Sequence, residues 1–318
     1  MGKLKGISDV NLSGKRVLIR VDYNVPLTDG QVDDDTRIRA TLPTLQKIMR
    51  SGATIMLMSH LGRPSEGKFV DSYSLKPVAR RLSSLLNKDV PLIRDWINGV
   101  EAEQGDVLML ENVRFQPGEL SNDDALAKKM AALCDVFIND AFATAHRAQA
   151  STHGVAKFAS LACAGPLLMR EIEALSQAFE NPIRPMTAIV GGSKVSSKLT
   201  VLESLMEQID QLIIGGGIAN TFLKARGHNI GHSLYEAELV PAASALLSMA
   251  EEQGKDIPLP VDVVCARAFS KDAEALCKQT GDVEDDDLIM DVGPKTAKLY
   301  ASILKRAKTI VWNGPLGV

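Results

Sequence analysis

Short, continuously apolar runs alternate with segments of helical pattern along the chain, and this alternation limits the possible fold more than any other feature. The runs are residues 16–21, 53–59, 106–110, 135–140, 186–190, 211–215, 260–264, 287–293 and 309–314. Strands that are apolar at every position are buried on both faces, which is typical of parallel sheets covered by helices. In the intervening segment 41–52, Leu45 and Ile48 fall on one helical face. We therefore predict an α/β fold with doubly wound, Rossmann-like parallel sheets.

The length of 318 residues suggests two domains. The best boundary is the segment "PLLMREIEALSQAFENPIRP" (166–185), which has the pattern of one long helix and has predicted strands on both sides. We expect domains over residues 1–165 and 186–318, joined by a helix over 166–185, with a cleft between them.

Composition excludes several classes of protein. Lysine and arginine number 36 against 39 aspartates and glutamates, so there is no basic excess to drive binding to nucleic acid or to a membrane surface. No apolar stretch is long enough to cross a bilayer, and the first residues lack a secretory pattern. The four cysteines form no C-x-x-C pair. We expect a cytoplasmic protein with free thiols and small-molecule partners.

Polar and cationic side chains follow one predicted strand after another in the first half. They are Asp22 and Asn24, His60 and Arg63, Asn112 and Arg114, then Asp140, His146 and Arg147, with Arg37 and Arg39 just before a predicted helix. The carboxyl ends of parallel strands share one edge, so these side chains should meet in space. Arginine donates two parallel hydrogen bonds to phosphate or carboxylate, and the set therefore predicts a site for a small anion. Alternatively, the arginines make ordinary surface salt bridges and His60 is structural. Asp22 would accept a bond from a substrate hydroxyl or orient an arginine.

Glycines end the strands of the second half. They are Gly191 and Gly192, then Gly215, Gly216 and Gly217, then Gly314 and Gly317 on either side of Pro315. Glycine lets backbone amides approach a ligand, and the start of a helix adds partial positive charge. We expect these strand ends to line a groove for adenine, ribose and phosphates.

Lys194 and Lys198 follow the first glycine pair at i, i+4 spacing, which predicts a shared helix face with an anion between them; the alternative is a solvated lysine. The segment matches neither the P-loop nor the G-x-G-x-x-G pattern, and this argues against a nicotinamide dehydrogenase. His228 and His232 share the spacing but surround a glycine, so we predict a loop and no metal site. The acidic run 282–287 is expected to be a solvated loop.

Eight segments together resemble the phosphoglycerate kinase family, of bacterial type, in the family's order and along essentially the whole chain. They are "RVDYNVP", "RIRATLPTL", "SHLGRP", "LENVRF", "DAFATAHR", "GGSKVSSKL", "GGGIANTF" and "WNGPLGV". The resemblance implies two domains, a monomer, and reversible phosphoryl transfer in glycolysis. ATP and the carboxylate of 3-phosphoglycerate would give ADP and 1,3-bisphosphoglycerate.

The resemblance also implies roles for individual residues. Those that would bind phosphoglycerate are Asp22, Asn24, Arg37, His60, Arg63, Arg114 and Arg147. Those that would lie along the nucleotide are Lys198, Gly215, Gly216, Asn313, Pro315 and Gly317. Arg37 and Lys194 would flank the phosphoryl group in flight. The acceptor carboxylate is ionised at neutral pH and needs no general base, so the reaction would depend on positioning and charge neutralisation.

Members of the family continue beyond "WNGPLGV" with a glutamate and then a Gly-Gly-Asp-Thr loop, which contact ribose, phosphates and Mg²⁺. We therefore expect the ligand for the Mg²⁺ that accompanies ATP or ADP to lie beyond Val318, with no metal ligand in the chain itself. The alternative to an active kinase is then a catalytically silent fragment that binds phosphoglycerate or another anion.

Overall fold

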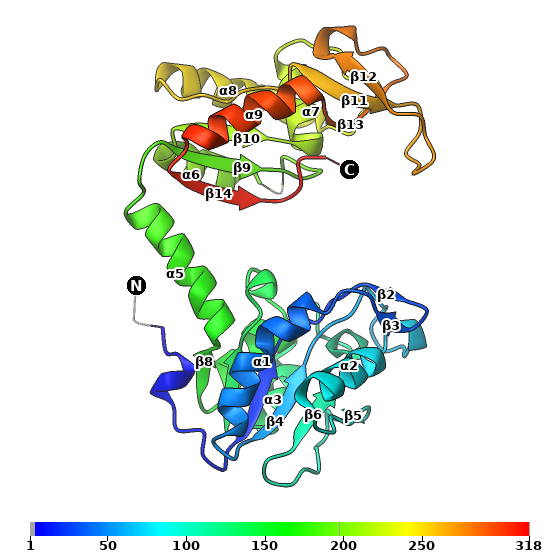
Figure 1. Cartoon of the computed structure of the whole chain (residues 1–318), viewed down its shortest axis with the longest axis vertical. Coiled ribbons are helices and arrows are strands. Elements are labelled where there is room, and N and C mark those ends of the chain that lie inside the picture. Colours follow the sequence, from blue (N-terminus) through cyan, green and yellow to red (C-terminus); the bar gives the residue numbers. More distant parts are fainter. Residues whose placement is uncertain (1–3, 197, 318) are drawn as a thin grey trace. The chain divides into compact units, whose positions relative to one another are not determined.

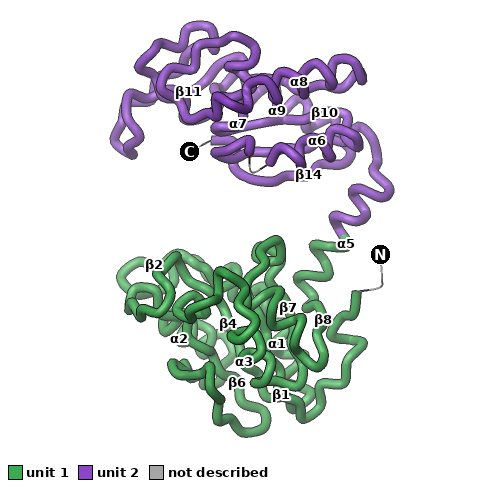
Figure 2. The backbone as a smooth tube through the Cα atoms, turned by 180° about the vertical axis from the view of Figure 1, so that it is seen from behind, with its two compact units in different colours: residues 1–173 green, residues 174–318 purple. Residues whose placement is uncertain are grey.

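The computed structural model describes residues 4–196 and 198–317. These residues form two compact units that divide after Glu173, inside helix α5 (Pro166–Glu180) (Figure 2). Helix α5 occupies most of the segment 166–185 that the sequence marks as one long helix. Each unit contains a parallel sheet with helices packed on it, so the predicted α/β class is confirmed.

The first unit is built on a parallel sheet in the order β5-β6-β4-β1-β7-β8 (Figure 1). Its strands are β1 (Arg16–Arg20), β4 (Thr54–Met58), β5 (Leu92–Ile93), β6 (Val107–Leu110), β7 (Val136–Asn139) and β8 (Ala162–Ala164). A separate hairpin pairs β2 (Leu27–Thr28) with β3 (Gln31–Val32). The helices and helical turns are η1 (Ile7–Asp9), α1 (Thr36–Met49), η2 (Asp71–Tyr73), α2 (Lys76–Leu86), η3 (Val113–Phe115), α3 (Asp124–Ala132), η4 (Phe142–Thr144), the π-helical turn η5 (Ala150–Gly154) and α4 (Val155–Phe158).

Both faces of this sheet are buried, which explains the continuous apolar runs. Successive residues of a strand point to opposite faces. Val17 and Ile19 of β1 pack in the cluster that includes the apolar sides of α1 and α2. Leu18, between them, packs in the cluster that includes α3 and α4. The polar residues that follow the strands are therefore carried on a rigid, fully packed layer.

The second unit contains a parallel sheet in the order β10-β9-β14, together with helices on both faces. Helices α6, α7 and α8 pack on one face, and α9 packs on the other. The elements are β9 (Met186–Val190), α6 (Leu199–Gln208), β10 (Gln211–Ile214), α7 (Gly216–Ala225), η6 (Ala237–Leu239), α8 (Val240–Glu252), η7 (Thr280–Asp282), α9 (Pro294–Arg306) and β14 (Thr309–Asn313).

Two of the predicted strands do not join that parallel sheet. β11 (Asp262–Ala266) lies between β12 (Leu276–Gln279) and β13 (Leu288–Val292), and it is antiparallel to both. The prediction of parallel strands at 260–264 and 287–293 is therefore wrong in direction, although both runs form strands. Burial alternates along β12, as in an antiparallel strand with one solvated face, and this neighbour carries no continuous apolar run that could reveal it.

The acidic run 282–287 is not simply a solvated loop, and that prediction is wrong at Asp287. The Asp287 side chain is fully buried, and it accepts a hydrogen bond from Lys278 Nζ at 2.7 Å. Lys278 also contacts Glu284 at 3.1 Å, and Arg267 pairs with the same carboxylates. A buried carboxylate needs such partners because burial disfavours its charged form. No helix within the described part of the chain is both long and apolar enough to cross a membrane.

Candidate active site

The cationic residues predicted for the first unit follow neighbouring strands. Strands β6, β4, β1 and β7 lie side by side and parallel, so their carboxyl ends share one edge, as the sequence predicts. The residues that follow these ends are Arg114 after β6, His60 and Arg63 after β4, Asp22 and Asn24 after β1, and Arg147 after β7. Arg37 lies in the first turn of α1. Residues separated by more than a hundred positions are thereby brought to one edge of the sheet.

Asp22 orients Arg37, which is one of the two roles expected of it. The Asp22 Oδ2 atom accepts a hydrogen bond from Arg37 Nη1 at 2.5 Å, and Oδ1 accepts one from the Asn24 N–H at 3.2 Å. The Arg37 side chain is still 51% exposed. This pair therefore directs the guanidinium without burying it, and a planar donor with five N–H groups can still serve a ligand.

Gly62 connects two more of the predicted residues. Its N–H donates to Asn24 Oδ1 at 2.9 Å, and its carbonyl accepts a bond from Arg114 Nη1. Its φ is +60°, and a Cβ atom there would lie 2.3 Å from the Tyr73 ring. Only glycine satisfies both the left-handed backbone and the close packing, so the turn after β4 depends on it.

Arg114 has a buried guanidinium with one unsatisfied N–H group among the described residues. The residue is 8% exposed, and its buried Nε has no hydrogen-bond partner among the described residues. Burial lowers the pKa of Arg114, and the positive charges of Arg147 and Arg63 act in the same direction. A buried donor without an acceptor costs free energy, about 1–3 kcal/mol in typical proteins. An anion at this edge would supply both the acceptor and the opposite charge.

His60 is 5% exposed and contacts the guanidinium of Arg20, a residue that the sequence reasoning passed over. Burial lowers the pKa of His60 to about 2, and Arg20 and Arg114 add repulsion. His60 is therefore neutral at ordinary pH. The signal that could have revealed Arg20 is its place as the last residue of β1, a charged side chain at the end of an otherwise apolar run. His146, in contrast, is exposed and accepts a bond from Arg147 Nε at 3.3 Å.

In the second unit, the glycine-rich strand ends pack against one another. A Cβ atom on Gly191 would lie 1.7 Å from the carbonyl oxygen of Pro315. The Gly216 N–H donates to the Leu316 carbonyl at 2.8 Å, and the Ile218 N–H donates to the Gly192 carbonyl at 3.2 Å. Two backbone amides at the start of α7 are thus hydrogen-bonded within the protein. The glycines permit close packing of backbone on backbone, which the sequence reasoning attributed to a ligand alone.

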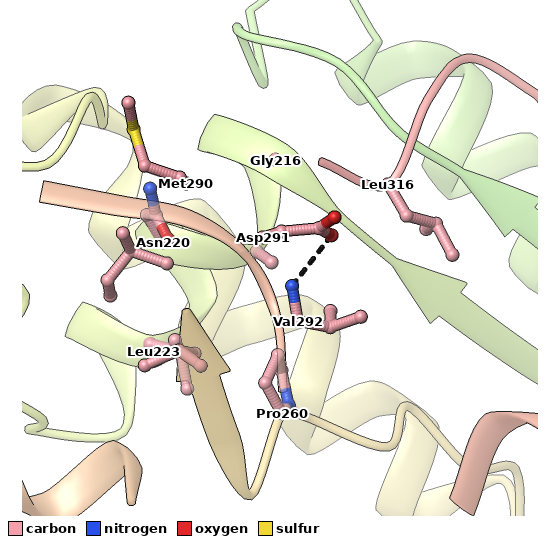
Figure 3. Close-up of a pocket in the computed structure, with 11 residues that line it drawn as sticks. Gly216, Asn220, Leu223, Pro260, Met290, Asp291, Val292 and Leu316 are labelled. Atoms are coloured by element: carbon pink, nitrogen blue, oxygen red, sulfur yellow. Dashed lines mark hydrogen bonds between the residues drawn. The ribbon is translucent and has the colours of Figure 1, made fainter. Parts of the chain in front are cut away.

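A cavity of about 370 Å³ opens beside these turns. Gly216, Pro315 and Gly317 line it, together with apolar residues that the sequence analysis did not select: Leu234, Phe269, Leu288, Ile289 and Met290. Phe269 is 76% exposed and lies outside any strand, and no pattern in the sequence connects it with the other residues of this wall. Mostly apolar walls with a few polar groups suit a flat heterocycle. Figure 3 shows the adjoining smaller cavity of about 10 Å³, where Gly216, Asn220 and Met290 recur and Asp291 lies beside Leu316.

The two lysines do not share a helix face, so that prediction is wrong. Helix α6 begins after Lys198, and Lys194 lies in the loop before it. The loop is held by Glu236, which accepts bonds from the Ser196 N–H at 2.7 Å and from its hydroxyl at 2.5 Å. These bonds and the positive charge of Lys194 lower the pKa of Glu236. Lys198 Nζ donates to Asn313 Oδ1, which joins two of the residues predicted for the nucleotide.

The family model of phosphoglycerate kinase matches residues 7–318. The chain belongs to the phosphoglycerate kinase family. It is 55% identical to a phosphoglycerate kinase from Coxiella burnetii, with a TM-score of 0.79, covering 99% of this chain and 81% of that one. It is 32% identical to a phosphoglycerate kinase from Pyrococcus horikoshii OT3, with a TM-score of 0.82, covering 98% of this chain and 81% of that one. Its function is accordingly that of a phosphotransferase, a phosphoglycerate kinase.

A phosphoglycerate kinase uses ATP or ADP with Mg²⁺. Mg²⁺ prefers oxygen ligands, above all carboxylates. The cavity is lined by glycines and apolar side chains, and the carboxylate of Asp291 lines the adjoining cavity. Within residues 4–196 and 198–317, no group of three or more His, Cys, Asp or Glu side chains could hold a metal ion. His228 and His232 lie in a loop.

The close packing at Gly191 leads to a test of this phosphoglycerate kinase fold. Gly191→Ala is expected to destabilise the second unit by about 3 kcal/mol or more, because a methyl group has to displace the Pro315 carbonyl. Nucleotide binding should weaken with it. Urea unfolding measures the first effect and calorimetric titration with ADP the second. Gly281→Ala is the control, since a Cβ atom there meets nothing within 4 Å. Equal stability of the two variants would contradict the packing argument.

Proposed function

We propose that the first unit of this phosphoglycerate kinase binds 3-phosphoglycerate and that the second binds ATP or ADP. The single observation that carries the first assignment is the set of arginines that follow three strands at one edge of the sheet, Arg63, Arg114 and Arg147, with a buried Arg114 Nε that lacks an acceptor among the described residues. A substrate with a carboxylate and a phosphate supplies acceptors for several arginines at once. The residues in this role are Asp22, Asn24, Arg37, His60, Arg63, Arg114 and Arg147.

The second assignment is supported by the apolar cavity beside the glycine-rich strand ends. An adenine ring would lie against its apolar walls, and the phosphates would extend toward Lys198 and Asn313, which already contact each other. The residues in this role are Lys198, Gly215, Gly216, Asn313, Pro315 and Gly317. Mg²⁺ bound with the nucleotide would neutralise phosphate charge.

The chemistry asked of the protein is positioning and charge neutralisation. The acceptor carboxylate is ionised at neutral pH, so no side chain has to remove a proton from it. Charge spreads over the equatorial oxygens of the transferred phosphoryl group, and cations that meet this charge lower the barrier. We assign this catalytic role to Arg37 and Lys194.

A coupled assay with ATP, Mg²⁺ and 3-phosphoglycerate tests the function of the chain directly. We expect ADP release that depends on 3-phosphoglycerate. Calorimetric binding of 3-phosphoglycerate without turnover would instead favour the alternative of a silent anion-binding fragment. Failure of either ligand to bind would contradict the assignment of the two sites.

Arg114 gives a sharper test of the phosphoglycerate site. Arg114→Ala is expected to raise the Kd for 3-phosphoglycerate by about 10- to 100-fold, since a charge-assisted hydrogen bond contributes about 1.5–3 kcal/mol. Arg81→Ala is the control, because Arg81 pairs with Asp35 at 2.6 Å and belongs to no strand end of the site. Calorimetry measures both values. Similar affinities in the two variants would remove Arg114 from the site.

We further propose that the protein is of the bacterial type, acts in the cytoplasm and is a monomer. The higher identity to the Coxiella burnetii enzyme than to the Pyrococcus horikoshii one supports the first point. A role in glycolysis supports the second. Light scattering after size exclusion tests the third, and a mass of twice 34.3 kDa would refute it.

A further inference from the structure

A buried chain of polar side chains runs beneath the predicted phosphoglycerate site. Glu119 accepts hydrogen bonds from the Ser151 hydroxyl at 2.5 Å and from the Ser151 N–H at 2.9 Å. The same hydroxyl oxygen accepts a bond from Arg20 Nε at 3.0 Å. Arg20 Nη2 lies 3.1 Å from His60 Nδ1. We call these four residues the buried relay. Glu119, Ser151 and Arg20 are fully buried, and His60 is nearly so.

The donor and acceptor roles between Arg20 and His60, at one end of the relay, are fixed by chemistry. A guanidinium has only N–H donors and no acceptor. His60 Nδ1 can therefore be bonded to Arg20 only through its lone pair, which leaves the ring hydrogen on Nε2. The hydrogen bond that one ring nitrogen makes decides the state of the other. Arg20 also donates to the Val21 carbonyl at 2.5 Å, so the guanidinium is held at several points and has little freedom to turn.

At the other end of the relay, the Glu119 carboxylate supplies the charge opposite to that of Arg20. Burial lowers the pKa of Arg20 to about 10, and attraction to Glu119 counteracts this. Burial likewise raises the pKa of Glu119, while the charge of Arg20 and the bonds from Ser151 act to lower it. A buried guanidinium is tolerated only with a paired carboxylate and satisfied hydrogen bonds. Ser151 connects the two from the π-helical turn η5, a kind of turn that is often found at functional sites.

We propose that Arg20 is a positioning residue that holds His60 in its neutral form with the hydrogen on Nε2, and that Glu119 holds Arg20 through Ser151. His60 then serves an anion as a fixed N–H donor whose charge does not change with pH. The link to 3-phosphoglycerate depends on the proposed function, but the state of the ring does not.

The other charges that face His60 act in the same direction. They come from Arg114 in η3, from Arg147 beyond η4 and from Arg37 in α1. A protonated His60 would be repelled by each of them and would lose the bond to Arg20. These arginines disfavour the charged ring but say nothing about which nitrogen of the neutral ring carries the hydrogen. That selection belongs to Arg20 alone among these groups, because it is the one whose bond reaches Nδ1.

The ring state can be read directly from nitrogen-15-labelled histidine by NMR. The full chain is recorded between about pH 8 and pH 5, a range in which an ordinary histidine titrates. His60→Asn identifies the signal. We expect an unprotonated Nδ1 and a protonated Nε2 throughout. In the double variant Arg20→Met/Glu119→Gln, which removes both buried charges together, the ring should lose this fixed state. Its Kd for 3-phosphoglycerate, from calorimetry, should rise about tenfold, in keeping with one lost hydrogen bond.

Arg16→Met is the matched control, since Arg16 lies at the other end of β1 and bonds the carbonyls of Leu133 and Val100. It should leave the His60 signals unchanged. A hydrogen on Nδ1 in the wild-type protein would overturn the proposal, as would a double variant with the wild-type ring state. The wild-type spectrum can overturn the proposal even if the double variant does not fold. If the wild type has the expected ring but binds no 3-phosphoglycerate, the relay stands and the proposed function fails.

Discussion

Arg37→Ala is expected to lower kcat by about 100- to 1,000-fold, while the Kd for ADP changes by less than about threefold. A preorganised cation that meets developing charge contributes to the transition state more than to the bound nucleotide. Arg37 is suited to this role because the Asp22 carboxylate holds its guanidinium at 2.5 Å while half of the side chain stays exposed. Steady-state kinetics gives the first quantity, and calorimetric titration with ADP gives the second.

Arg39→Ala is the matched control for this prediction. Arg39 lies in the same helix, its side chain is 53% exposed against 51% for Arg37, and it also pairs with an aspartate, Asp35, at 2.7 Å. The two substitutions therefore remove the same charge from equally exposed positions of one helix. We expect kcat of Arg39→Ala to stay within about twofold of the wild type, as for ordinary surface substitutions. A near-normal kcat for Arg37→Ala, or equal losses in both variants, would refute the catalytic assignment.

The sheet of the first unit could be predicted because each of its long strands has a recognisable apolar run in the sequence. A run such as 16–21 or 53–59 is mostly apolar and does not alternate between apolar and polar residues, and burial on both faces is the simplest physical reason for that. The shorter β5 and β8 offered no such run. Strand direction in the second unit was not predictable, because β12 alternates in burial and pairs with β11 through a register set by the intervening loop.

Most residues that we propose for the phosphoglycerate site share a feature that is visible in the sequence, because they follow a strand; Arg37, in α1, does not. The buried relay beneath them could not be predicted from the sequence. Arg20 meets Ser151 across 131 positions and His60 across 40, and neither pairing leaves a pattern in the sequence. The apolar wall that includes Phe269 and Met290 was missed for a similar reason, since its residues come from separate loops and strands. Local signals reveal the residues at the end of a strand better than the buried groups that orient them.

A contact between residues far apart in the sequence also explains why the prediction of a shared helix face for Lys194 and Lys198 is wrong. Their i, i+4 spacing predicts one helix face, but the bonds from Ser196 to Glu236 hold the segment as a loop, and Glu236 is 40 positions away. Lys198 contacts Asn313, another residue that we propose for the nucleotide, whereas Lys194 is exposed on the loop before α6. The role that we propose for Lys194 is to neutralise the charge that develops on a transferred phosphoryl group.

Lys194→Ala is therefore expected to lower kcat by about 100-fold or more and to change the Kd for ADP by less than about threefold. Lys224→Ala is the control, since Lys224 is also exposed in the second unit but lies in the last turn of α7, at the end opposite the glycine-rich start. Kinetics and calorimetry are measured as for Arg37. Loss of ADP affinity with unchanged kcat would make Lys194 a binding residue and contradict the assignment.

The double variant Arg37→Ala/Lys194→Ala distinguishes a shared role from two separate ones. If both cations stabilise the charge of one transferred phosphoryl group, removing the second after the first should cost less than removing it from the wild type, because residues that act as a unit are strongly non-additive. We expect the combined loss in kcat to fall at least tenfold short of the product of the single losses. Losses that multiply would mean that Arg37 and Lys194 contribute independently and do not act as a unit, since independent sites contribute additively to the activation free energy.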